Sequence, residues 1–119
     1  MLPGVFAREN PIKMRLHKSL LLQAVLVLNS VSGAQAQAVQ RGAEFARANC
    51  ARCHSIGRSG PSPFSPAPPF RTLHEKYPVE TLEEALGEGI FTGHPDMPEF
   101  QLEPGEIGDF IAFLKSLEQ

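Results

Sequence analysis

The chain has 119 residues, enough for one domain and too few for two comfortable hydrophobic cores. Its 11 Lys and Arg against 13 Asp and Glu give a formal net charge of −2. Without a basic patch, that charge balance excludes a general nucleic-acid-binding protein.

The N-terminal part has the three features of an export signal. Basic residues follow Met14, an apolar run extends over Leu20–Leu28, and small residues surround Ala36. We therefore predict a signal peptide over residues 1–36, cleavage after Ala36 and a periplasmic protein. The apolar run is too short for a permanent membrane span and no second one follows, so we expect no span in the mature chain.

Residues 1–13 add nothing that an export signal needs, whereas a signal that starts at Met14 has ordinary proportions. We predict that translation starts at Met14. The alternative is an unusually long basic segment, which would change nothing downstream.

The predicted mature domain, residues 37–119, holds 7 Lys and Arg against 12 Asp and Glu, a formal charge of −5. An apolar core of this size rarely supplies more than about 3–5 kcal/mol of stability. The mature domain has one Tyr, no Trp and many Pro. A disulfide or a cofactor is therefore expected to supplement the core.

The periodicity of apolar residues predicts an all-α domain. We expect helices over residues 39–49, 78–89 and 104–117, the last with Ile107, Phe110, Ile111 and Leu114 at helical spacing. The segment 57–69 is too rich in Pro and Gly for a regular helix or a central strand, so it is interpreted as a loop wrapped over another part of the molecule. The segment 90–102 is predicted to be irregular.

Cys50-Ala51-Arg52-Cys53-His54 has the Cys-x-x-Cys-His pattern of covalent haem attachment. Two thiols at this spacing reach the two vinyl groups of one porphyrin edge, and the adjacent His54 then lies under the iron as a proximal ligand. The sequence thus predicts one haem c per chain, attached through Cys50 and Cys53.

Three other interpretations of the two cysteines remain open. They could form a disulfide in an oxidising compartment. A redox dithiol would require a βαβ setting that an all-α chain lacks. A zinc site would need two further ligands, and His74 and His94 are badly spaced for it.

Met97 is the predicted second axial ligand. It lies in a Pro-stiffened polar loop and belongs to no helical stripe, whereas a thioether opposite His is common in haem electron carriers. The ordinary alternative is a gap-filling core methionine. His94 is the competing ligand, and His74 is predicted to lie on a helix surface.

Four segments together resemble the class I monohaem cytochromes c of bacteria, small proteins with the mitochondrial-type fold, over about residues 39–118. They are Gly42 on the first helix, Cys50–His54, the segment Ala67–Phe70, and Asp109–Lys115 on the last helix. The resemblance implies three to five short helices around one haem, with the first and last helices crossed where Phe113 meets Gly42. It also implies that the carbonyl of Pro68 accepts a hydrogen bond from the proximal imidazole, with Pro68 and Phe70 in the haem pocket.

The chain departs from the family pattern in several places. Ala67 replaces the usual Gly, Phe70 replaces Leu, and Phe45 is offset by one residue from the common aromatic position. Tyr77 or Arg71 would have to replace the Trp that often contacts a haem propionate. The ring of lysines by which mitochondrial cytochrome c docks its partners is absent.

The resemblance implies an electron-transfer protein rather than an enzyme, either a free shuttle or the cytochrome subunit of a respiratory or dehydrogenase complex. Its partners would be redox proteins that dock transiently to a monomer or a complex subunit. The alternative function is a haem-based sensor or peroxidase-like protein in which Met97 is displaced and the iron binds a small ligand.

Overall fold

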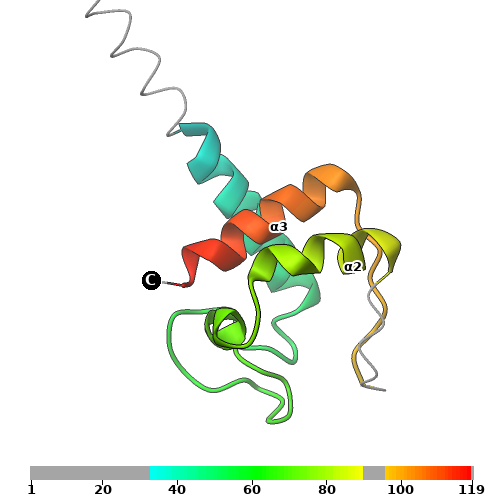
Figure 1. Ribbon diagram of the computed structural model, residues 1–119. Helices are drawn as coiled ribbons and strands as arrows, with labels where there is room; N and C mark the ends of the chain where they lie inside the picture. Colours follow the sequence, from blue (N-terminus) through cyan, green and yellow to red (C-terminus); the bar gives the residue numbers. More distant parts are fainter. Residues whose placement is uncertain (1–32, 90–95, 119) are drawn as a thin grey trace, which may run out of the picture. The chain divides into compact units, whose positions relative to one another are not determined.

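The computed structural model describes residues 33–89 and 96–118, and these form a small helical domain (Figure 1). The N-terminal helix occupies residues 33–49. It is followed by the 3-10 helices η1 (Phe70–Glu75) and η2 (Val79–Thr81), then by α2 (Leu82–Glu88) and α3 (Pro104–Ser116). No strand occurs within the described residues, so the predicted all-α class is confirmed.

The C-terminal helix α3 forms where its sequence pattern predicted it. Pro104 occupies the first turn, and a capping box joins Glu103 and Glu106, whose carboxylate accepts the Glu103 backbone N–H at 3.1 Å. One face of the helix is buried. It consists of Ile107, Phe110, Ile111, Phe113 and Leu114.

The N-terminal helix crosses α3 at Gly42, as the first and last helices were expected to do (Figure 1). A Cβ atom added to Gly42 would lie 2.1 Å from the backbone oxygen of Asp109 and 2.8 Å from Cβ of Phe113. Beside this contact, the Arg41 guanidinium binds both carboxylate oxygens of Asp109, at 2.6 and 2.7 Å. The absence of a side chain at Gly42 therefore permits the close approach of the two helices.

The helix predicted over residues 78–89 is present but begins with a 3-10 turn. Val79 and Leu86 are buried, and Gly89 ends α2 with a φ of 100°. Such a conformation favours glycine at a helix end. The segment before α3 contacts this end of α2, because the Leu102 N–H donates a hydrogen bond to the Leu86 carbonyl at 2.9 Å.

Two parts of the fold differ from the sequence prediction. The described part of the N-terminal helix begins at residue 33, six residues before the predicted start at residue 39. The 3-10 helix η1 was not predicted. Residues 57–69 contain neither helix nor strand, in agreement with the expected loop.

Several predictions fall outside the described residues. These are the apolar part of the signal, the start at Met14, and the placement of His94. Within residues 33–89 and 96–118, no helix has the length and apolarity that a membrane span requires.

Candidate functional site

The Cys-x-x-Cys-His motif forms a tight turn at the end of the N-terminal helix. The backbone N–H of Cys50 donates to Ala46 at 2.8 Å, so this residue still belongs to the last helical turn. The N–H groups of Cys53 and His54 both donate to the Cys50 carbonyl, at 3.1 and 2.9 Å. Local hydrogen bonds thus place both thiols and the imidazole beside one cavity.

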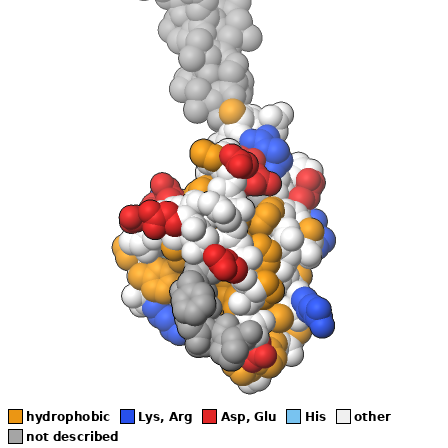
Figure 2. All heavy atoms as spheres, turned by 90° about the vertical axis from the view of Figure 1, so that its right-hand side faces the viewer, with side chains coloured by type: hydrophobic (Ala, Val, Ile, Leu, Met, Phe, Trp, Pro, Cys, Tyr) orange, Lys and Arg blue, Asp and Glu red, His pale blue; other side chains and the backbone are white. Residues whose placement is uncertain are grey.

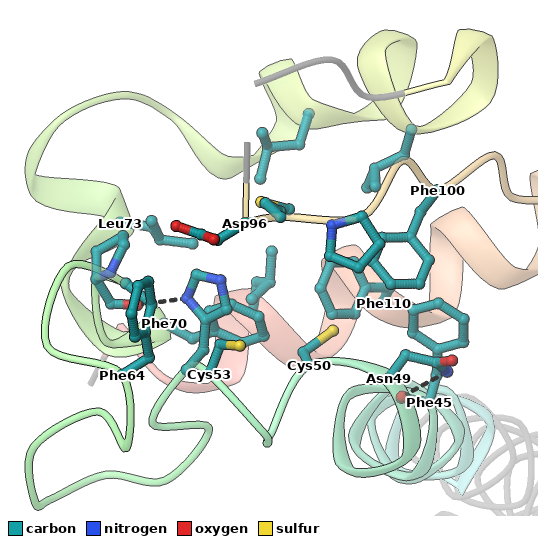
Figure 3. Close-up of a pocket in the computed structure, with 18 of the residues that line it drawn as sticks. Phe45, Asn49, Cys50, Cys53, Phe64, Phe70, Leu73, Asp96, Phe100 and Phe110 are labelled. Carbon is teal, nitrogen blue, oxygen red and sulfur yellow. Dashed lines mark hydrogen bonds between the residues drawn. The ribbon is translucent and has the colours of Figure 1, made fainter. Parts of the chain in front are cut away.

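This cavity has a volume of about 410 Å³, within the range typical of small-molecule and cofactor sites. Figure 3 shows Cys50 and Cys53 along one side of it. Its walls are mainly aromatic and aliphatic, contributed by Phe45, Phe64, Pro66, Ala67, Pro68, Phe70, Leu73, Leu82, Leu86, Pro98, Phe100, Phe110 and Leu114. The lining therefore favours a largely apolar ligand within reach of the thiols and the imidazole.

His54 is held in a defined orientation. Its Nδ1 lies 2.7 Å from the Pro68 carbonyl oxygen, which can only accept a hydrogen bond. Nδ1 must therefore carry the proton, so the lone pair of the neutral ring is on Nε2, where it can bind a metal. The Phe70 ring packs on the imidazole, with 4.8 Å between the ring centroids.

Met97 lines the same cavity as His54, although 43 positions separate them in the sequence. The neighbouring Asp96 lies across the cavity from Cys50 and Cys53 (Figure 3). His54 and Met97 would therefore both border a ligand bound in this cavity. His74 is exposed on η1, in agreement with its predicted surface position.

Cys50 is poorly suited to act as the reactive thiol of a redox dithiol. Burial, followed by the nearby Cys53, raises the pKa of the Cys50 thiol to about 11, whereas reactive dithiols have lowered values. Cys50 and Cys53 form no disulfide with each other. The described part of the chain also contains no group of three or more His, Cys, Asp or Glu side chains that could hold a metal.

Four aromatic side chains form one continuous packed group beside the cavity. Phe45 meets Phe100 and Phe110 edge to face, with centroid distances of 6.5 and 5.6 Å. Phe110 meets Phe70 in the same manner at 5.8 Å. The offset position of Phe45 is therefore compatible with a role in the cavity wall.

Some residues of the cavity were not predicted from the sequence. Asn49, Asp96 and Phe100 all line it. The Asn49 amide donates to the Phe45 carbonyl at 3.0 Å. Phe100 lies three residues after Met97. An aromatic residue so close to a predicted iron ligand could have indicated that Phe100 lines the cavity.

Of the two proposed substitutes for the missing Trp, only Tyr77 lines the cavity, where burial raises the pKa of its phenol. Arg71 instead donates to the Ser55 hydroxyl at 3.2 Å and approaches the Gly57 carbonyl at 3.5 Å.

The chemistry of the donor set fits a covalently attached haem. Two thiols with vinyl-reactive spacing, an imidazole with Nε2 available, and a thioether border one apolar cavity. Comparison with known proteins agrees with this chemistry. Residues 39–118 match the family model described as cytochrome c.

The chain is also similar to cytochrome c-552 of Bradyrhizobium diazoefficiens (strain USDA 110). The two are 30% identical over 104 residues, which cover 87% of this chain and 98% of that protein. No solved structure matches the chain. The family match over most of the folded domain, supported by this relative, shows that the chain belongs to the cytochrome c family.

Proposed function

We propose that this chain is a periplasmic single-electron carrier with one haem c, attached through Cys50 and Cys53 and ligated by His54 and Met97. The observation that carries the proposal is the apolar cavity that these four side chains border together. The iron of a bound haem would supply the one-electron chemistry.

The side chains around the cavity would keep the iron six-coordinate in both oxidation states. The Pro68 carbonyl holds the His54 ring and increases its basicity, while the thioether of Met97 favours ferrous iron. The aromatic wall of Phe45, Phe100 and Phe110 limits access of water. A small reorganisation between the two oxidation states is what an electron carrier requires.

Export and transient docking complete the proposal. Covalent attachment of haem takes place on the exported side, in agreement with a signal peptide over residues 1–36. The domain would dock to donor and acceptor proteins through small interfaces, either as a free shuttle or as a complex subunit. Residues 37–119 hold 7 Lys and Arg against 12 Asp and Glu, so partners that recognise a ring of lysines are not expected. The face in Figure 2 shows both acidic and scattered basic side chains.

The first test concerns the sixth ligand. The ferric protein should show the Met-sulfur charge-transfer band, and Met97→Ala should abolish it. His94→Ala is the matched control and should retain the band, because His94 is the competing candidate. Rapid carbon monoxide binding by the reduced wild type would contradict the proposal and favour a ligand-binding sensor.

The second test concerns covalent attachment. Cys53→Ser, expressed in a host competent for cytochrome maturation, should give little haem-stained protein on a denaturing gel. Undiminished staining would contradict attachment at this thiol.

A further inference from the structure

A buried hydroxyl lies next to the proposed iron ligand, at Ser55. It is the one buried polar residue among those the structure describes, with 9% of its surface exposed. Its hydroxyl accepts a hydrogen bond from Arg71 at 3.2 Å and is 3.4 Å from the Ser59 carbonyl, to which it donates. Its backbone N–H donates to the Ser62 hydroxyl at 3.0 Å.

The same residue connects the two segments that meet at His54. The Phe70 N–H donates to the Ser55 carbonyl at 2.9 Å. The neighbouring pair, His54 and Pro68, forms the imidazole hydrogen bond of 2.7 Å. The Ser55 carbonyl and the Pro68 carbonyl thus take part in adjacent bonds between residues 54–55 and 68–70.

Arg71 directly follows the 68–70 segment and adds hydrogen bonds to the junction between residues 54–55 and 68–70. Its guanidinium reaches from the end of the 68–70 segment to Ser55 and to the Gly57 carbonyl. A charge-assisted bond to a buried hydroxyl is stronger than a neutral one. We propose that Ser55 and Arg71 are positioning residues that hold the Pro68 carbonyl against Nδ1 of His54 and thereby set the electron donation of the imidazole to the iron.

The proposal rests on the proposed function, because His54 must be the iron ligand. It predicts a specific sign for the reduction potential. A looser Nδ1–H bond makes the imidazole a weaker donor, which disfavours ferric iron. Ser55→Ala, which changes no charge, should therefore shift the redox equilibrium toward reduced iron, by up to about tenfold if one hydrogen bond is weakened.

Loss of a positive charge near the iron should shift the redox equilibrium in the opposite direction, toward oxidised iron. Arg52 lies between the two cysteines, and its side chain is exposed. Arg52→Ala removes one cation near the site and should favour oxidised iron slightly, since an exposed charge is screened. It serves as the matched control for Arg71→Ala, which removes a cation and loosens the junction together.

The decisive measurement is hydrogen exchange of the His54 Nδ1–H proton, followed by NMR in the reduced, haem-loaded full chain. Ser55→Ala and Arg71→Ala should accelerate the exchange by about fivefold to tenfold. Ser55→Thr, which keeps the hydroxyl, should restore the slow rate, and Arg52→Ala should leave it unchanged. If Ser55→Ala fails to retain haem, Arg71→Ala provides the same readout.

Wild-type exchange rates in both Ser55→Ala and Arg71→Ala would overturn this inference and leave the proposed electron carrier intact. Equal acceleration by Arg52→Ala would also overturn it, because charge rather than position would then be responsible. A wild-type spectrum in which the His54 ring lacks the signature of an iron ligand would instead contradict the proposed function itself.

Discussion

Phe70 joins the proposed ligand side of the cavity to the helical core. Its ring packs on His54 at 4.8 Å and on Phe110 at 5.8 Å, and only 7% of its surface is exposed. Phe70→Ala should destabilise the haem-loaded protein by about 3–5 kcal/mol, because it leaves a void among buried rings. Phe70→Leu, which introduces the residue usual in the family, should cost much less.

Thermal or denaturant unfolding of the haem-loaded variants measures both effects. Phe64 provides the matched control, since it also lines the cavity but is 39% exposed. Phe64→Ala should therefore cost less than half as much as Phe70→Ala. Equal losses at the two positions would show that burial of Phe70 does not determine its contribution.

The predictability of the site varied from residue to residue. The thiols and His54 belong to one local motif, so their spacing alone indicated their chemistry. The bond between His54 and Pro68 spans 14 positions, and only the family resemblance suggested it. The roles of Ser55 and Arg71 depend on how the 57–69 loop brings these two residues together. The spacing of apolar residues along the sequence does not indicate the path of that loop.

At the scale of elements, the crossing of the N-terminal helix and α3 depends on Gly42. Gly42→Ala would place a methyl group 2.1 Å from the Asp109 carbonyl oxygen, so the helices must separate. Because the obstacle is backbone rather than a flexible side chain, we expect a loss at or above the usual range for overpacking, about 1–3 kcal/mol. Chemical denaturation of the haem-loaded protein measures this loss.

Gly108 gives the control for this substitution within the same pair of helices. An added Cβ there has no neighbour within 4 Å, and the residue lies inside α3. Gly108→Ala should stabilise the protein by about 0.5–1 kcal/mol through helix propensity. If Gly42→Ala also stabilised the protein, the close approach at Gly42 would not limit the packing.

The ion pair beside this crossing predicts a pH dependence. The hydrogen bond from Arg41 lowers the pKa of Asp109 below its usual value, which is about 3.9 in an unfolded chain. The stabilisation is therefore present above about pH 4 and is lost as the pH falls through the lower folded-state pKa. Asp109→Asn should lower the melting temperature slightly at neutral pH, and the gap from wild type should close in acid.

Melting curves of the haem-loaded protein across this range check the prediction. Because Arg41 is exposed and Asp109 is partly exposed, high salt should also narrow the gap. Glu84→Gln on α2 removes an equal, exposed charge away from the helix crossing. Its melting temperature should not approach that of the wild type in this way as the pH falls. A gap that persists unchanged below about pH 3 would exclude the ion pair as its cause.

The elements themselves were predictable to different degrees. The apolar spacing in 104–117 and Pro104 identified α3 almost to its ends. By contrast, η1 buries only Phe70 and Leu73, and two residues three positions apart are too weak a pattern to identify a short 3-10 helix. Val79, Leu82 and Leu86 have the spacing of one continuous helix, so that pattern did not indicate the separate 3-10 helix η2 over Val79–Thr81.

At the scale of the whole domain, the described helices and loops enclose a packed core that opens on one side into a cavity. The buried cluster, which includes Phe110, Leu114 and Leu86, continues directly into the cavity walls. An apolar cavity of about 410 Å³ in so small a domain leaves much of the core to be supplied by its ligand. Folding and haem attachment are therefore expected to be coupled.

This coupling predicts that the full chain made without cytochrome maturation is largely unfolded. Its far-UV circular dichroism should show less than about half the helical signal of the haem-loaded chain, with no cooperative thermal transition, because the walls around Leu86 and Phe110 have no apolar partner. The same chain produced with the maturation system is the control and should unfold cooperatively. A haem-free chain with native helix content and a sharp transition would mean that α3 and the N-terminal helix suffice for folding, with the cavity imposing no requirement for the cofactor.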